Sequence, residues 1–174
     1  MRPASPGPGS DDAERLALVG QATFLESFAG ELGGGDILAH CAKQHAVAVY
    51  QDWLADPRMG LWLAEAANGG APVGYAVSGP AGLPIPDPRP DDIEIRRIYL
   101  LHRFHGVGVG RALMQAALDA ARFGGSSRAL LGVYAKNDLA LRFYRKVGFQ
   151  AIGVRKFLVG NAWCDDMILS LDLV

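Results

Sequence analysis

The sequence has few cysteines and no long apolar run. Its two cysteines, Cys41 and Cys164, lie far apart and form no Cys-x-x-Cys motif. We therefore expect buried free thiols of a reducing compartment rather than a disulfide or a metal pair. No apolar stretch approaches the roughly 18 residues that cross a bilayer, and residues 1–12 lack the apolar core of a signal peptide. The sequence thus predicts a cytoplasmic protein with no membrane partner.

An excess of charge of either sign is also missing. The 174 residues include 17 basic and 18 acidic side chains, for a net charge of −1. Because nucleic-acid-binding proteins carry a clear basic excess, we expect no nucleic-acid partner. Half of the residues are hydrophobic, which excludes a disordered chain and suffices for one packed core. Glycine is plentiful at 22 residues, which indicates backbone with positive φ or close approach.

The spacing of apolar and turn-forming residues predicts one α/β domain. Residues 1–12, rich in Pro, Gly and Ser, are expected to form a flexible tail that can hold a short edge strand, and residues 13–174 the domain. The expected helices run from Asp12 to the glycines at 33–35, from Asp36 to about Leu54, and over Val109–Phe123 and Asp138–Val147. The expected strands are Gly60–Ala66, Val73–Ser78, Ile93–Leu101, Ala129–Tyr134, Phe149–Val159 and Trp163–Leu173.

The most informative segment is Glu94–Arg111, in which an expected strand runs through a glycine-rich loop into an expected helix. Glycines at 106, 108 and 110 let backbone N–H groups turn towards one point at the helix N-terminus, which suits a pyrophosphate. A dinucleotide fingerprint is excluded because its third glycine position holds Arg111. A P-loop is excluded because Gly110 is followed by Arg111 and Ala112. A tight strand–helix turn without a ligand stays open as an alternative.

Two blocks of the sequence carry a family resemblance. The loop His105–Gly110 resembles the acyl-CoA pyrophosphate loop of the GNAT N-acetyltransferase superfamily, Gln/Arg-x-x-Gly-x-Gly/Ala, with His105 at the Gln/Arg position. The segment Asn137–Phe149 resembles a second block of that superfamily, N-x-x-A-x-x-F-Y-x-x-x-G-F, and it follows in the right order. Within the superfamily, Ile93–Val174 is most similar to the PaiA-type branch, with weaker similarity upstream.

The resemblance implies a fold and a cosubstrate. The GNAT fold is a mixed α/β (α+β) architecture, here a central sheet of six to seven strands flanked by about four helices, with central strands splayed at the acyl-CoA site. The cosubstrate would be acetyl-CoA, with its pantetheine arm along the backbone of Ile98, Tyr99 and Leu100 and hydrogen-bonded by Asn137. The remaining residues expected to bind the cosubstrate, mainly its phosphates, are His105, Gly106, Val107, Gly108, Val109, Gly110, Arg111, Ala112 and Lys146.

Acetyl transfer to an amine needs a base for the ammonium and an acid for the leaving thiolate. Glu94, eleven positions before His105, is the candidate base, and Tyr144 of the Phe-Tyr pair is the candidate acid. Regular strand alternation puts Glu94, Arg96 and Ile98 on one face and Arg97 and Tyr99 on the other. An ion-paired strand carboxylate and a buried core aromatic are the respective alternatives. No metal site is expected, since His40 and His45 lack the four-residue spacing of two ligands on one helix face.

The sequence therefore predicts an acetyl-CoA-dependent N-acetyltransferase that acts on a small primary amine in a ternary complex. The PaiA resemblance implies a polyamine acceptor, for which carboxylates in the upstream half, Glu26, Glu31, Asp36 and Asp52, would suit the charge. A protein or peptide amine acetyltransferase and a non-catalytic acyl-CoA-binding regulator are the alternatives. The resemblance also implies a possible homodimer.

Overall fold

A seven-stranded mixed sheet forms the centre of the molecule. The structure is a computed structural model and describes residues 1–7, 9–160 and 162–173. The strands are β1 (Arg2–Pro3), β2 (Gly60–Glu65), β3 (Pro72–Pro80), β4 (Asp92–Leu100), β5 (Arg128–Tyr134), β6 (Gln150–Val159) and β7 (Ala162–Asp172), in the order β1-β2-β3-β4-β5-β7-β6. The helices are α1 (Asp12–Phe28), α2 (Gly34–Gln44), α3 (Val47–Ala55), α4 (Val109–Phe123) and α5 (Asp138–Val147), and η1 (His102–Phe104) is a 3-10 turn.

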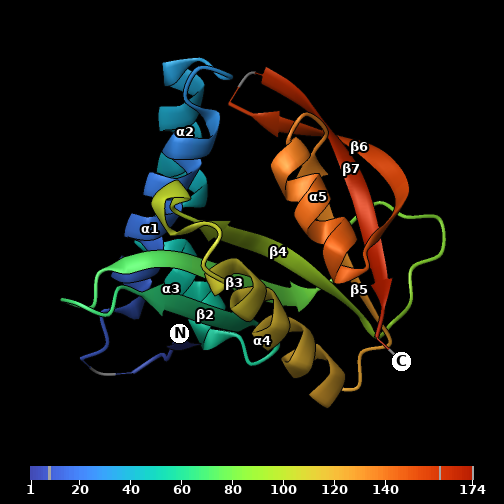
Figure 1. Cartoon of the computed structure of the whole chain (residues 1–174), viewed down its shortest axis with the longest axis horizontal. Helices are drawn as coiled ribbons and strands as arrows, with labels where there is room; N and C mark the ends of the chain where they lie inside the picture. The colour runs from blue at the N-terminus through green and yellow to red at the C-terminus, as the bar shows by residue number, and fades with distance from the viewer. Residues whose placement is uncertain (8, 161, 174) are drawn as a thin grey trace.

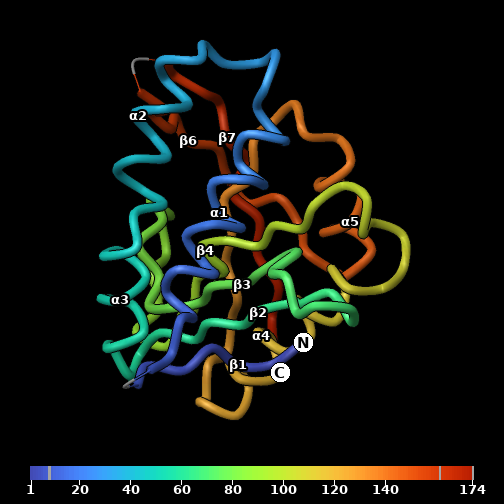
Figure 2. The backbone as a smooth tube through the Cα atoms, turned by 90° about the vertical axis from the view of Figure 1, so that its left-hand side faces the viewer, coloured from blue at the N-terminus to red at the C-terminus, as the bar shows by residue number. Residues whose placement is uncertain are grey.

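Helices cover both faces of the sheet (Figure 1). On one face, α4 and α5 bury an apolar cluster that includes Ala76, Leu113 and Tyr144. On the other face, α1 and α3 bury a second cluster around Tyr50, Tyr75 and Val77. Figure 2 shows α1, α2 and α3 together along one side of the sheet. A third cluster joins α1 and α2 to the β6–β7 hairpin, so the N-terminal helices reach the opposite half of the sheet.

The two central strands splay apart, as the family resemblance implies. β4 and β5 are parallel and pair only at Asp92 with Arg128, Ile93 with Ala129 and Glu94 with Leu130. Beyond Glu94 the edge of β4 that faces β5 has no strand partner, and the two strands diverge (Figure 1). The two strands thus form a V. Its closed end is held by an ion pair between the nearly inaccessible side chains of Arg128 and Asp92, at 2.7 Å from Nη2 to Oδ2. This pair fixes the point at which the sheet opens.

Strand β4 contains a bulge that changes which side chains share a face. Val77 of β3 pairs with Arg97, whereas its neighbour Ser78 pairs with Ile95, so Arg96 is an extra residue in β4. Glu94 therefore lies on the same face as Arg97, and the predicted alternation is wrong. The physical reason is that a bulge inserts one residue against its partner strand and reverses the facing of everything beyond it.

The second predicted helix is two helices, because the chain turns at His45 and Ala46. His45 ends α2 with φ −119° and ψ 24°, and Ala46 is extended with φ −67° and ψ 148°. The break lets the His45 ring pack between α1 and α3 against Tyr50. Gly20 of α1 faces both side chains so closely that a Cβ would not fit there. This packing replaces the straight helix that periodicity predicts.

The N-terminal residues described contact the domain. Arg2 binds the carboxylates of Asp12 and Glu65, with its Nη2 at 2.6 Å from Asp12 Oδ1 and 3.0 Å from Glu65 Oε1. The flexibility of residues 1–12 in solution and the boundary of the domain at residue 13 stay predictions. No helix in the described part of the chain is long and apolar enough to cross a membrane.

Candidate functional site

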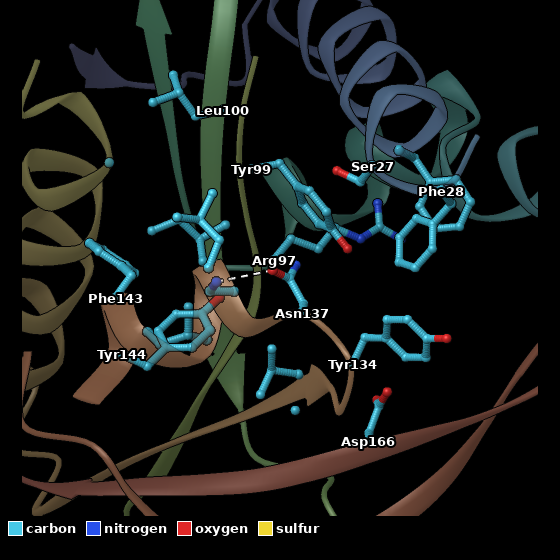
Figure 3. A pocket seen from close by; sticks show the side chains of 18 of the residues that line it. Ser27, Phe28, Arg97, Tyr99, Leu100, Tyr134, Asn137, Phe143, Tyr144 and Asp166 are labelled. Atoms are coloured by element: carbon cyan, nitrogen blue, oxygen red, sulfur yellow. Dashed lines mark hydrogen bonds between the residues drawn. The ribbon is translucent and has the colours of Figure 1, made fainter. Parts of the chain in front are cut away.

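A cavity of about 490 Å³ occupies the opening between β4 and β5. Two sets of residues line it. One set, which we term the loop group, comes from the end of β4 and the segment that follows: Leu100, His105, Gly106, Gly108, Gly110 and Arg111. The other, which we term the scattered group, comes from α1, α2, β4, β6 and β7: Phe24, Ser27, Phe28, His40, His45, Arg97, Arg155, Phe157, Cys164 and Asp166. Residues of β4, β5 and α5 lie between them, and Figure 3 shows the cavity from close by.

The loop group presents backbone donors. Gly106 and Gly108 have φ of 80° and 89°, a region that L side chains rarely adopt, and a Cβ at either would meet no atom within 4 Å. The first hydrogen bond within α4 runs from the Ala112 N–H to the Gly108 carbonyl at 3.0 Å. The N–H groups of residues 109–111 therefore have no partner within the helix. Open space in front of unpaired donors and a helix N-terminus can hold an anion such as a phosphate.

Side chains hold this loop in place from two directions. The His105 Nε2 lies 2.8 Å from the Leu100 carbonyl oxygen. Because a carbonyl only accepts, Nε2 carries the proton and donates it. The backbone N–H of His102 donates to Glu26 Oε2 of α1 at 2.8 Å. His105 thus ties the loop back to β4, while Glu26 fixes it to the N-terminal helices.

Helix α5 brings an amide and a phenol to the cavity. Asn137 caps the helix, since its Oδ1 accepts the Ala140 N–H at 3.0 Å (dashed in Figure 3), and its Nδ2 stays available as a donor. Tyr144 is 7% exposed and lines the cavity, and burial raises the pKa of its phenol. In the part of the chain that the structure describes, its hydroxyl has no hydrogen-bond partner. The phenol therefore stays protonated at neutral pH and can donate to a bound ligand.

A buried polar chain joins β4 to the N-terminal helices. Arg97 Nη1 donates to the Tyr50 hydroxyl at 2.8 Å, and that hydroxyl lies 2.8 Å from His45 Nδ1. Burial, with a smaller effect of the Arg97 charge, lowers the pKa of His45 to about 2 and that of His40 to about 4. Both histidines are therefore neutral at physiological pH, and the Tyr50 hydroxyl proton can be donated to His45.

Asp166 of β7 is the one carboxylate among the described residues that line the cavity. Its Oδ2 lies 3.1 Å from Arg155 Nη2, and burial raises the pKa of its carboxyl group. The Arg155 guanidinium lies over Gly132 of β5, where a Cβ would stand 2.6 Å from Nη2. A side chain at 132 would therefore displace the Arg155 guanidinium from this position.

Comparison with known proteins identifies the family. The sequence model of the Acetyltransferase (GNAT) family matches residues 26–149. An uncharacterised N-acetyltransferase of Mycobacterium tuberculosis (strain ATCC 25618 / H37Rv) is 34% identical over 163 residues, which cover 94% of this chain and 99% of the relative. The chain belongs to the GNAT family. It is an N-acetyltransferase by this membership.

Two further comparisons extend the family assignment. The N-alpha-acetyltransferase RimI of Mycobacterium tuberculosis (strain ATCC 25618 / H37Rv) is 39% identical to this GNAT chain over 92 residues, 52% of this chain and 53% of that protein. The PaiA N-acetyltransferase of Thermoplasma acidophilum, solved in complex with coenzyme A, has the same fold, with a TM-score of 0.74 over 93% of both chains at 17% identity. The GNAT fold, including its splayed mixed sheet, is thus confirmed.

The structure brings together most of the residues predicted for the GNAT site. Ten of them line the cavity: Ile98, Tyr99, Leu100, His105, Gly106, Gly108, Gly110, Arg111, Asn137 and Tyr144. Val107, Val109 and Ala112 line a second hollow with Ala64 and Val73, on the other side of the loop. Lys146 is exposed on α5 and lines neither. Glu94 lies outside both, and its Oε2 accepts the Gly82 N–H at 2.9 Å.

Sequence reasoning missed most of the scattered group. The carboxylates that it named, Glu26, Glu31, Asp36 and Asp52, do not line the cavity. Arg155 and Phe157 alternate inward along β6, a signal that strand periodicity could have supplied. The spacing of His40 and His45 bears only on metal binding and does not indicate that both rings line the cavity. No group of three or more His, Cys, Asp or Glu suited to a metal occurs among the described residues.

Proposed function

We propose that the protein transfers an acetyl group from acetyl-CoA to a primary amine of a small molecule, by direct attack in a ternary complex. The observation that carries this proposal is the cavity itself. It joins a glycine-rich anion loop, an unpaired strand edge and a protonated phenol within one continuous space. Those are the three features that a long phosphorylated thioester and its leaving thiolate require.

The loop side of the cavity suits the cosubstrate. The unpaired edge of β4 at Ile98, Tyr99 and Leu100 supplies backbone groups that can pair with the amides of a pantetheine arm as a strand would. The N–H groups around Gly108 and the charge of Arg111 would hold the pyrophosphate, and the Asn137 Nδ2 would donate to the arm. Lys146, exposed outside the cavity, would meet only the part of the nucleotide that extends into solvent.

The chemistry needs an acid, a base and no protein nucleophile. Nitrogen of the neutral amine bonds to the acetyl carbon and loses a proton to the base, the carbon–sulfur bond breaks, and Tyr144 gives its proton to the leaving sulfur. Glu94 is the base that the sequence proposes, and it would need intervening water to reach the cavity. Asp166 is the alternative that the cavity offers directly. Burial raises the pKa of the Cys164 thiol, which keeps it protonated and favours direct transfer over an acetyl-cysteine intermediate.

The acceptor is proposed as a small amine because the scattered group encloses part of a cavity rather than a flat surface. A polyamine is the acceptor that the PaiA similarity suggests. A protein or peptide amine is the second candidate, favoured by the similarity to RimI over half of the chain. The homodimer is also part of this proposal, and light scattering of the purified protein measures it.

The test is thiol release from acetyl-CoA at mildly alkaline pH, across polyamines, amino acids, aminoglycosides and lysine-containing peptides. Release with one class of small amine supports the proposal. Release with peptides only would favour the second candidate. Binding of CoA without release with any amine would indicate a non-catalytic acyl-CoA-binding protein, and absence of CoA binding would contradict the proposal altogether.

A further inference from the structure

Arg97 is a charged residue on the cavity wall that the proposed transfer does not use. It pairs with Val77 of β3 and lies on the same face as Tyr99, towards α1 and α3. Its guanidinium lies over the rings of Trp53 and Tyr50, at 4.6 Å and 5.4 Å from their centroids. These rings fix the plane of the guanidinium, as is typical of an arginine that is preorganised for a ligand.

The guanidinium has donors to spare. Nη1 is engaged by the Tyr50 hydroxyl at 2.8 Å. Nε and Nη2 have no hydrogen-bond partner among the residues described, and Arg97 forms no ion pair with any of them. Its neighbours His40 and His45 are neutral, because burial lowers their pKa values. A half-buried cation with a free edge, held rigidly beside a cavity, is a site for a planar anion.

The charge of the whole cavity also favours an anionic ligand. Its lining holds four arginines, Arg96, Arg97, Arg111 and Arg155, against the single carboxylate of Asp166, which is already paired with Arg155. The phosphates of the cosubstrate would be held at the loop beside Arg111. Arg97 is left with no counter-charge from either the protein or the loop ligand. A polycationic acceptor would meet like charge there, at a cost in affinity.

We propose that Arg97 binds a carboxylate of the acceptor, so that the acceptor is an amino acid or a similar amine with a carboxylate rather than a polyamine. This inference rests on the proposed function and names its substrate class. The carboxylate would accept bidentate hydrogen bonds from Nε and Nη2, the geometry that arginine offers and lysine lacks. The remaining donor, Nη1, would keep its bond to Tyr50 and hold the orientation.

The experiment compares acceptors that differ only in the carboxylate. Thiol release is measured with each amino acid, its amide and its decarboxylated amine, including the pairs ornithine and putrescine, and lysine and cadaverine. We expect kcat/KM to be about 10- to 100-fold higher for the acid than for the amide or the amine, the range of a charge-assisted hydrogen bond. A preference for putrescine or cadaverine overturns the inference while it supports the proposed function. Silence with every amine contradicts both.

Substitutions of Arg97 distinguish a residue that binds the acceptor from one that only supports Tyr50. In Arg97→Gln the ratio of kcat/KM for the acid to kcat/KM for the amide should fall close to one, with kcat/KM for the amide nearly unchanged. An arginine that only supports Tyr50 would instead lower both values together. Arg58→Gln is the matched control, since Arg58 is exposed and pairs with Asp56 away from the cavity. The Arg58→Gln variant should keep the full preference for the acid over the amide.

A second measurement covers the case in which Arg97→Gln does not fold. Arg97→Lys keeps the charge and loses the bidentate fork, and we expect it to lose about 10-fold of the preference. Calorimetry with CoA present then compares an N-acetyl amino acid with its amide on the unmodified protein. Tighter binding of the acid supports the inference. Equal binding of the two overturns it.

Discussion

The loop group comes from 12 consecutive residues, Leu100 to Arg111, whereas the scattered group spans the chain from Phe24 to Asp166. The loop group offers backbone N–H groups, and its side chains matter little beyond the glycine conformations and the tie through His105. The scattered group offers side chains whose positions depend on a helix break and on the pairing of the β6–β7 hairpin. Binding of a common cosubstrate can thus be preserved while acceptor choice changes.

The largest effect should come from the phenol at the junction of the two groups. Tyr144→Phe removes one hydroxyl without changing the buried ring, so we expect kcat to fall about 100-fold or more through loss of the acid. CoA affinity should stay the same. Stopped-flow thiol release and calorimetry measure the two quantities.

Tyr134→Phe is the matched change at another tyrosine of the cavity. It should alter the acceptor KM more than kcat. An unchanged kcat in Tyr144→Phe would show that the thiolate leaves without this proton.

A change confined to the loop group should break cosubstrate binding alone. Gly108 has φ of 89°, so Gly108→Val is strained by about 1–3 kcal/mol and would shift the N–H groups at the start of α4. We expect CoA affinity to fall about 10- to 100-fold with the scattered group intact. Gly35→Ala, at an open helical position without positive φ, is the control and should bind CoA normally. Unchanged affinity in Gly108→Val would mean that the loop does not contact the cosubstrate.

Asp166 and Glu94 are the two candidate bases, and substitution of each compares their contributions. Asp166 lines the cavity, whereas Glu94 accepts a hydrogen bond from Gly82 outside it. We expect Asp166→Asn to lower kcat/KM about 10-fold or more and Glu94→Gln to lower it less, because only Asp166 lines the cavity in which the amine would bind. The pH dependence of kcat/KM for both variants measures the contribution of each. The opposite ranking would return the base role to Glu94 through water.

The last comparison concerns the stability of the protein at low pH. Burial lowers the pKa values of His45 and His40 to about 2 and about 4, while in the unfolded chain both titrate near 6.5. Below pH 6.5 the unfolded state therefore binds more protons, and the free energy of unfolding falls by up to about 1.4 kcal/mol per pH unit for each histidine. Above about pH 7.5 this contribution to the pH dependence vanishes.

Urea unfolding between pH 7.5 and 5.5 measures how steeply the free energy of unfolding changes with pH. His45→Gln should reduce this dependence, while His102→Gln, an exposed position, should leave it unchanged. A flat profile for the unmodified protein would show that the rings are accessible to protons in the folded state.

The sequence predicts the loop group well because local rules determine it. Alternating glycines between a strand and a helix fix both the backbone path and the open donors, whereas Asn137 and Tyr144 are identified only by the resemblance of the second block to the GNAT superfamily. The facing of Glu94 could not be predicted, because it depends on a bulge set by pairing with β3, whereas Arg97 shares a face with Tyr99 as strand alternation predicts. Likewise, the break at His45 arises from packing against Gly20, a contact between residues 25 positions apart.

The V between β4 and β5 leaves the sheet incomplete, because the facing edges of the two strands do not pair with each other past Glu94. If acetyl-CoA supplies the missing strand, the cosubstrate is also a folding partner. Stability then rises with its free concentration, by about 2.7 kcal/mol at 100 times the dissociation constant. In a starved cell with little acetyl-CoA, the same chain would open more often and meet proteases more often. The abundance of the enzyme would follow its cosubstrate with no separate regulator.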